Sequence, residues 1–414
     1  MALSLLRQLV GITDTRVVGW DIDRGALVVY VRPTWFVARC GSCGRLCHGG
    51  AVATEGREWR HLDMAGFMVF LKCDVRRVYC GKCGKTGVER LPWASDPRAR
   101  FTDDFDDEVA FLAQRCDKTA VEKMMRIAWR SVGRSIERVL RRRRPANQLD
   151  DLVALGVDEI SYRKHHHYLT LVADQVEGRI VWGKAGRDAE TLKAFFDELG
   201  GERTKKLEAV SIDMSTAYLG AVREKAPHVQ VVFDRFHVQG LASKALDEVR
   251  RDLWQELRRA DPKAARAMKH TRWALLRNPM SLTDAERAKL AEIQKDNRPL
   301  YRAYLLKEEL RDILDRRQPN VVRELLLKWI SWSRRSRLAP FARVAKTIRG
   351  YLDEIVAYVR WRLTNGLVEG LNNKARLLTR RAYGFHSAEA ALAMILLCCS
   401  GLVLWPVHKY FEAA

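Results

Sequence analysis

Two pairs of cysteines have the spacing of metal ligands. Cys40-Gly-Ser-Cys43 and Cys80-Gly-Lys-Cys83 are CxxC pairs, and each is followed by glycine. A CxxC turn presents two thiolates from one tight loop, and four thiolates complete the tetrahedral coordination of a structural zinc ion. We therefore expect Zn²⁺ at these four cysteines. Unmetallated or redox-active cysteines are the alternative, and Cys47, His48 or Cys73 could replace a member of the quartet.

Three carboxylates stand where they could share catalytic metal ions. Asp158 lies in the first strand of an expected α/β region, Asp213 ends its fourth strand, and Glu369 lies on a later helix. The first and fourth strands of a ribonuclease-H-like sheet can be neighbours, so both aspartates could project from one edge beside the glutamate. Converging carboxylates repel one another unless a cation lies between them, and Mg²⁺ or Mn²⁺ suits such oxygen ligands. Each carboxylate alone would be an ordinary surface or turn residue.

A pair of metal ions at such a site would support the cleavage and transfer of phosphodiester bonds. Two ions about 3.5 to 4 Å apart activate a water or a 3′-hydroxyl and stabilise the leaving oxygen in phosphodiester transfer. The carboxylate set therefore favours an enzyme that acts on nucleic acid.

A strongly basic helical segment lies between residues 115 and 147. It holds eleven Lys or Arg against three acids. The pattern predicts a helix over about 119–126, a break, and a second helix from Arg130, which is a helix-turn-helix arrangement. Arginines at steps of four, four and three form one stripe on the second helix, and such a stripe can neutralise DNA phosphates. The expected DNA contacts are Arg126, Arg130, Arg134, Arg138 and Arg141, and an ordinary solvated face is the alternative.

The surrounding elements indicate a multidomain fold. Residues 15–88 have the β-branched and aromatic pattern of strands, and Thr102 is placed to cap a helix. From residue 152, three expected strands precede alternating helices and strands. The expected domains are a β-rich zinc module over 1–95, a helix-turn-helix domain over 100–147, a ribonuclease-H-like α/β catalytic core over 150–239 and 361–414, and an all-α insertion over 240–360.

Charge and hydropathy narrow the choice of partner. The 414 residues include 73 Lys plus Arg against 51 Asp plus Glu, a formal net charge of +22, and 47% hydrophobic residues. Such an excess on a folded chain favours nucleic acid over a membrane surface. Residues 390–407 carry no charge, but Ser400, Gly401 and Pro406 interrupt the stretch, so we expect a buried helix rather than a membrane span. The first residues lack the pattern of a secretory signal, so we expect a cytosolic location.

The order of motifs resembles that of bacterial insertion-sequence transposases of the DDE type, in the ISL-three family. The shared features are the paired CxxC module, KTAVEKMMRIAWRSVGR, GVDEISYRK, YLTLVADQ, SIDMSTAY, FDRFHV and NGLVEGLNNKARLLTRRAYGF. The likeness covers nearly the whole chain, and it implies a location in the bacterial cytoplasm, at the nucleoid. It implies Asp158, Asp213 and Glu369 as the metal-binding triad, and a helical insertion before the glutamate.

The resemblance also implies further residues at the site. Asp234-Arg-Phe-His237 is similar to an Asp-x-x-His element of related transposases, in which His237 would orient the scissile phosphate or the DNA end. A structural histidine at the end of a strand expected over residues 229–238 is the alternative. Four basic residues after Glu369 are expected to hold DNA near the triad: Lys374, Arg376, Arg380 and Arg381. Most tryptophans of the insertion should be core, with base stacking by Trp273 as a minority interpretation. The triple histidine at residues 165–167 should form a basic hairpin tip.

The expected function is a transposase that binds terminal inverted repeats as a homo-oligomer on double-stranded DNA and catalyses cleavage and strand transfer. Two other classes stay open. A zinc-bearing helix-turn-helix transcriptional regulator would bind without catalysis, and a ribonuclease-H-like structure-specific nuclease would cleave without joining.

Overall fold

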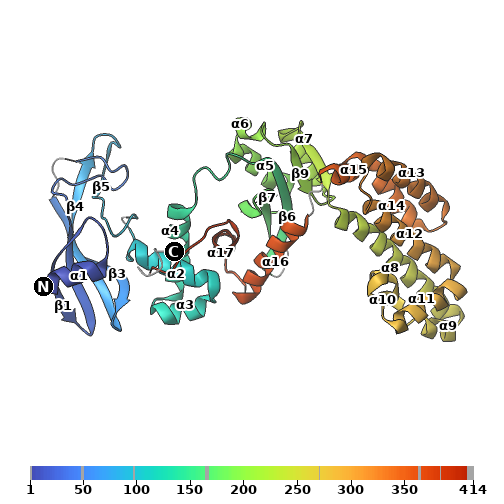
Figure 1. Ribbon diagram of the computed structural model, residues 1–414, viewed down its shortest axis with the longest axis horizontal. Coiled ribbons are helices and arrows are strands. Elements are labelled where there is room, and N and C mark those ends of the chain that lie inside the picture. The colour runs from blue at the N-terminus through green and yellow to red at the C-terminus, as the bar shows by residue number, and fades with distance from the viewer. Residues whose placement is uncertain are drawn as a thin grey trace. The chain divides into compact units, whose positions relative to one another are not determined.

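The structure, a computed structural model, describes residues 2–47, 51–96, 98–163, 167–269, 271–361, 365–382 and 384–407. The chain forms two compact units (Figure 1). The first contains Met1–Ala146 together with Arg380–Ala414, and the second contains Asn147–Thr379.

The first unit begins with a short helix and a five-stranded sheet. The strands lie in the order β1-β2-β4-β3, with β5 paired to β4, and β2 runs parallel to β4. The core of this module contains Trp59 and Trp93, whose rings meet edge to face at 5.6 Å. The elements are α1 (Ala2–Val10), β1 (Thr15–Asp23), β2 (Ala26–Pro33), β3 (Ala51–Met64), β4 (Phe67–Cys80) and β5 (Lys85–Val88).

Three helices follow the sheet. Thr102 begins α2 (Asp103–Arg115), as expected, because its side chain accepts the N–H of Phe105 and three acids occupy the first turn. Asp117 caps α3 (Lys118–Met125) in the same way. Arg126 then takes a left-handed conformation, φ 54°, which ends α3 and turns the chain into α4 (Trp129–Arg143). The two helices therefore lie close to the predicted ranges.

The uncharged segment near the C-terminus is a buried helix of the first unit. Ser387 caps α17 (Ala388–Cys399), and Gln114 of α2 donates to the carbonyls of Leu397 and Leu402. Among the described residues, no helix is long and apolar enough to cross a membrane. The placement differs from the expected grouping of 361–414 with the catalytic core. Because α17 is apolar on all sides, it must be buried against other elements, and it packs on α2 and α4.

The second unit is built on a mixed five-stranded sheet. Its order is β10-β9-β6-β7-β8, with β6, β7 and β8 antiparallel and β6, β9 and β10 parallel. Three strands followed by alternating helices and strands is the predicted succession. The elements are β6 (Ala154–Arg163), β7 (His167–Asp174), β8 (Arg179–Ala185), α5 (Ala189–Leu199), α6 (Gly201–Thr204), β9 (Ala209–Ile212), α7 (Thr216–Lys225) and β10 (Gln230–Phe233).

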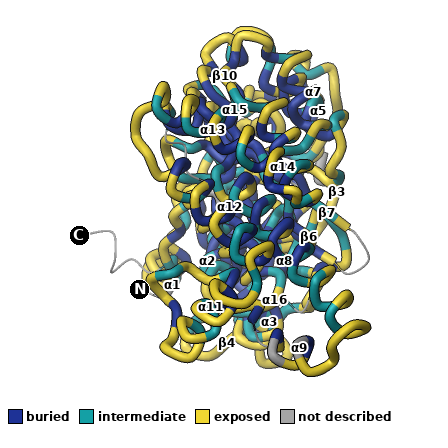
Figure 2. The backbone as a smooth tube through the Cα atoms, turned by 90° about the vertical axis from the view of Figure 1, so that its right-hand side faces the viewer, coloured by how far each residue is buried: buried dark blue, intermediate teal, exposed yellow. Residues whose placement is uncertain are grey.

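Residues 235–361 are helical, as expected. The sheet and these helices share one core, in which buried residues run from the strands into α12, α14 and α15 (dark blue in Figure 2). The helices are α8 (Arg235–Ala260), α9 (Pro262–Ala267), α10 (Thr271–Leu276), the 3₁₀ turn η1 (Pro279–Ser281), α11 (Asp284–Asp296), α12 (Arg298–Leu314), α13 (Pro319–Arg335), α14 (Ala339–Gly350) and α15 (Leu352–Trp361). The long helix α16 (Asn365–Arg381) follows and carries Glu369.

Candidate functional site

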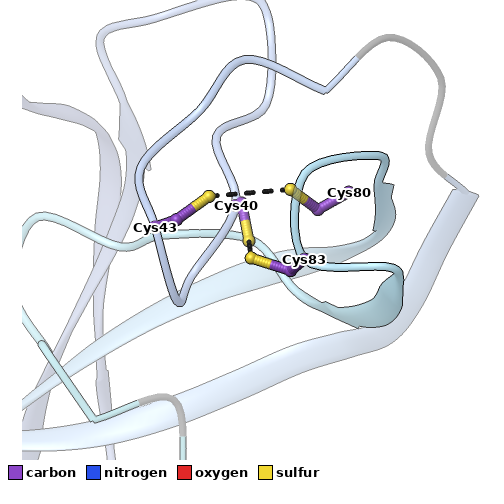
Figure 3. Close-up of side chains that lie close together, drawn as sticks. All are labelled: Cys40, Cys43, Cys80 and Cys83. Atoms are coloured by element: carbon purple, nitrogen blue, oxygen red, sulfur yellow. Dashed lines mark hydrogen bonds between the residues drawn. The ribbon is translucent and has the colours of Figure 1, made fainter.

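The four predicted cysteines meet in one cluster. The Sγ atoms of Cys40 and Cys83 lie 4.0 Å apart and those of Cys43 and Cys80 lie 3.6 Å apart (Figure 3). All four sulfurs lie within 4.8 Å of one another. Tetrahedral zinc with Zn–S bonds of about 2.3 Å requires sulfurs about 3.8 Å apart. The cluster therefore fits a structural zinc ion.

Local backbone chemistry builds this cluster. The N–H groups of Gly44 and Gly84 donate to the carbonyls of Cys40 and Cys80, both over 2.9 Å, so the two knuckles close in the same way. Both glycines have positive φ, 73° and 61°, which explains why glycine follows each pair. The N–H of Cys83 stabilises the Cys80 thiolate and lowers the pKa of Cys80 to about 6.

The spare cysteines lie outside the quartet. Cys47 and Cys73 are buried, and their thiols donate to the carbonyls of Arg45 and Asp74. Burial raises the pKa of Cys73 to about 12, which keeps it a neutral thiol. His48 lies outside the described residues.

Strand pairing brings Asp158 and Asp213 together. β6 and β9 are parallel neighbours, with Ala154 opposite Ala209 and Gly156 opposite Ser211. Asp158 lies two residues beyond the last paired position of β6, and Asp213 directly follows β9, so both lie at the same end of this strand pair. Burial raises the pKa of Asp213, and the nearby charge of Asp158 raises it further.

Asp158 is held on both oxygens. Its Oδ1 accepts the N–H of Glu159 over 2.7 Å, and its Oδ2 accepts Nδ2 of Asn372 over 2.5 Å. Asn372 is only 1% exposed and follows Glu369 by three residues on α16. One turn of helix separates these two residues, so the contact ties the helix of the glutamate to the strand of the aspartate. Asn372 was not predicted from the sequence, although its spacing after Glu369 was the available signal.

Asp234 adds a fourth carboxylate to the group. It is 2% exposed and caps α8 by accepting the N–H of Phe236 over 3.2 Å. Burial raises its pKa, and the charges of Asp158 and Glu369 add to the rise. His237 lies with Nε2 3.8 Å from Oδ2 of Asp234. The expected strand through Val238 is wrong, because β10 ends at Phe233, and His237 lies in the first turn of α8.

The four carboxylates are near enough to affect one another's pKa, but their oxygen atoms do not form a tight cluster. Within the described ranges, only the four cysteines bring three or more ligand atoms all within 4.8 Å of one another. Glu369 is exposed, whereas Asp234 is buried, so the group opens to solvent on the side of α16. The carboxylate oxygens of this group are hard donors, which is the kind of ligand that Mg²⁺ or Mn²⁺ prefers.

The predicted DNA contacts divide into paired and unpaired cations. The Arg138 guanidinium binds Asp106 through two bonds of 2.6 and 2.7 Å and is 13% exposed, and Arg126 is paired with Asp63. Arg141 lies 3.6 Å from Asp96 and is 69% exposed. Arg130 and Arg134 are exposed and have no ion pair with any described residue. Arg138 therefore holds α4 to α2, and the outward part of the stripe is shorter than expected.

The basic residues after Glu369 also differ from one another. Lys374, Arg376 and Arg380 are exposed on α16. Arg381 instead donates to the carbonyls of Ala113 and Gln114 at the end of α2. It therefore stabilises the C-terminus of that helix, where cations are favoured.

The zinc module carries a further set of cations that the sequence analysis did not single out. Six exposed Lys or Arg in and beside the two knuckles have no ion pair within the described chain. The only acid between residues 75 and 90, Glu89, is buried and bound by Arg76. We call this set the knuckle cations, and it comprises Arg39, Arg45, Arg77, Lys82, Lys85 and Arg90.

Two other predicted positions are less informative. Trp273 is 53% exposed, with the guanidinium carbons of Arg272 and Arg277 5.3 and 5.7 Å from its ring. His165 and His166 lie outside the described residues, and His167 begins β7.

Comparison with known proteins gives two matching family models. Residues 155–395 match the ISL3 model described as a DDE transposase, and residues 37–83 match the zinc finger of transposases IS204, IS1001, IS1096 and IS1165. Similar curated proteins include the transposase for insertion sequence element IS1557 of Mycobacterium tuberculosis, 40% identical over 96% of both chains. The transposase for IS1001 of Bordetella parapertussis is 32% identical over 90% of this chain and 91% of its own.

Proposed function

The chain belongs to the ISL3 family of DDE transposases, and from this membership we propose that it binds the terminal inverted repeats of an insertion sequence, cuts the DNA ends and joins their 3′-hydroxyls to target DNA. The observation that carries the proposal is the group formed by Asp158, Asp213 and Glu369, with Asn372 holding the first of them. A protein that only binds DNA has no need of such a group. We further propose Mg²⁺, or Mn²⁺, as the catalytic metal.

Asp158, Asp213 and Glu369 would hold the divalent ions. Bound ions would activate the water or 3′-hydroxyl and stabilise the leaving oxygen. Asn372 and the N–H of Glu159 fix the orientation of Asp158. His237, at the first turn of α8 beside Asp234, would contact the scissile phosphate. Both reactions are in-line phosphoryl transfers that require no covalent enzyme intermediate.

The proposed catalytic fold is ribonuclease-H-like with an all-α insertion. The adjacency of β6 and β9 supports it, because this pairing aligns the two aspartates. The helices from α8 to α15 lie in sequence between Asp213 and Glu369, which supports their assignment as the insertion.

The proposed DNA-binding surface combines α3 and α4, as a helix-turn-helix, with the zinc module. Exposed cations without acidic partners support it: Arg130 and Arg134 on α4, and the knuckle cations around the zinc site. Cations that neutralise backbone phosphates supply most of the sequence-independent affinity for DNA. We also propose Lys374, Arg376 and Arg380 as DNA contacts near the triad. Because both ends of an element must be cut, we propose that the protein acts as a homo-oligomer on DNA.

The test uses duplex DNA from the regions that flank the gene, where matching inverted repeats are expected. The protein should bind these ends, cleave them with Mg²⁺ and join the 3′-hydroxyl to a second duplex. Binding without cleavage would replace the proposal with a transcriptional regulator. Cleavage without joining would replace it with a structure-specific nuclease.

A further inference from the structure

Helices α4 and α17 pack against each other in the first unit. Residues of both helices line a groove. Its volume is about 560 Å³. The floor is apolar, with Ile136 and Met394 both buried. The rim is cationic, since Arg130 and Arg134 lie along α4. The imidazole of His386, which precedes α17, also lines the groove. Glu137 is the one acid that lines the described groove.

Lys118 is the unusual residue of this groove. It is 7% exposed, lines the groove and makes no hydrogen bond or ion pair with the described residues. Its Nζ lies 4.2 Å from the centre of the Trp129 ring, a cation–π contact. The charge of Glu137, which lines the same groove, is the nearby acid, but it makes no ion pair with Lys118 within the described chain. Burial of most of the side chain lowers the pKa of Lys118, so a ligand that brings negative charge into the groove would stabilise the ammonium.

Gly133 makes room for this lysine. A Cβ atom at that position would lie 3.2 Å from Nζ of Lys118. Glycine in a helix interior costs about 1 kcal/mol relative to alanine. Glycine at position 133 therefore lowers the stability of α4 and leaves space for the ammonium group of Lys118.

The N-terminus of α17 faces the same groove. Ser387 and Ala390 both line it, and the Ser387 hydroxyl accepts the N–H of Ala390 over 3.2 Å. The remaining N–H groups of the first turn, with the helix dipole, favour an anion. The dipole and the buried ammonium are independent features of one groove.

We propose that the α4–α17 groove binds a backbone phosphate of duplex DNA together with its deoxyribose, with Lys118 as the buried cation. The inference rests on the proposed function, because it assumes that this module binds DNA. The cationic rim and helix terminus suit the phosphate, and the apolar floor and the volume suit the attached sugar. Such a site reads no base, so it would fix the position of α4 on DNA and contribute affinity for any sequence.

The test measures the affinity of the full-length protein for duplex DNA against salt concentration. Lys118→Met keeps the packing against Trp129 but removes the charge. It should lower the slope of log K against log salt by about one and the affinity roughly tenfold, equally for repeat and unrelated sequences. Lys205→Met is the control, because it removes a charge that Glu202 already balances, and it should leave both quantities unchanged.

A second variant separates binding from folding. Gly133→Ala should raise the melting temperature and yet weaken DNA binding, because the new Cβ displaces Lys118. An unchanged salt slope in Lys118→Met, in a protein whose wild type binds DNA, would overturn the inference and leave the proposed function standing. If inorganic phosphate at matched ionic strength stabilises the wild type but not Lys118→Met while the salt slope stays the same, the groove takes a free anion and the DNA assignment is wrong. A wild type that binds no duplex DNA would instead contradict the proposed function.

Discussion

At the scale of single residues, the candidate site depends on how one carboxylate is held. Asp158 accepts one hydrogen bond from the backbone of Glu159 and one from Asn372. A fixed carboxylate loses less freedom when it binds a metal, and partners of metal ligands commonly change affinity or activity 10- to 100-fold when they are removed. Asn372 is therefore a positioning residue rather than a ligand.

Replacing Asn372 tests this role. Asn372→Ala should lower the cleavage rate about 10- to 100-fold and raise the Mg²⁺ concentration needed for half-maximal rate, with DNA affinity unchanged. Asn373→Ala is the matched control, because the neighbouring side chain is exposed and, within the described residues, its one hydrogen bond is accepted from Arg376. A loss of melting temperature without a change in metal requirement would show a purely structural role.

At the scale of elements, the sequence predicted most helices and strands because their periodicity and caps are local. The strands from β6 to β10 lie in the expected succession, and Thr102 caps α2 as expected. The misread element was FDRFHV, where apolar residues continue the pattern of β10 although Asp234 already caps α8. The packing of α17 on α2 and α4 depends on contacts between segments far apart in the chain, which an apolar run alone does not specify.

His61 joins the N-terminal sheet to α2 and predicts a pH dependence of stability. The His61 ring donates to the carbonyl of Val10, so in the neutral imidazole Nδ1 accepts the Thr102 hydroxyl over 2.9 Å. The same hydroxyl accepts the N–H of Phe105. This assignment keeps the imidazole neutral, and burial lowers the pKa of His61 from its ordinary 6.5 to about 4. Since the unfolded chain binds the proton more readily, folding stability falls as the pH drops from about 6.5 to 4.

The comparison with His61→Gln isolates this contribution. Between pH 7 and pH 4 the wild type should lose about 3 kcal/mol more stability than the variant. Denaturant midpoints of both proteins at each pH measure the difference in stability. Protonation of the zinc thiolates affects both proteins equally, so it cancels in the comparison. Parallel stability curves for the two proteins would contradict the neutral, buried histidine.

At the scale of the whole molecule, only part of the positive charge behind the net +22 is left to bind a ligand. Several arginines of α4 have a structural role, since Arg138 of the predicted stripe and its neighbours Arg142 and Arg143 bind acids of α2. The knuckle cations, in contrast, have no acidic partners within the described chain. Composition alone shows the excess, but only the folded structure separates the charges that bind protein from those left for a ligand.

Neutralising part of this set tests the zinc module as a DNA-binding surface. Arg77→Gln, Lys82→Gln and Lys85→Gln combined should lower the slope of log K against log salt by about three, while the protein retains one zinc ion. The control replaces Arg203, Lys205 and Lys206 by glutamine, because each of these is paired with an acid. An equal decrease in both variants would indicate a general charge effect rather than a contact surface.

The central claim is that the carboxylate group on β6, β9 and α16 performs the chemistry. It is tested by Mg²⁺-dependent cleavage of an inverted-repeat duplex by the wild type and by Asp158→Asn, Asp213→Asn and Glu369→Gln. We predict that each variant binds the duplex as the wild type does and cleaves it at least roughly a thousandfold more slowly. Full cleavage activity in any one variant would contradict the claim and remove that residue from the site.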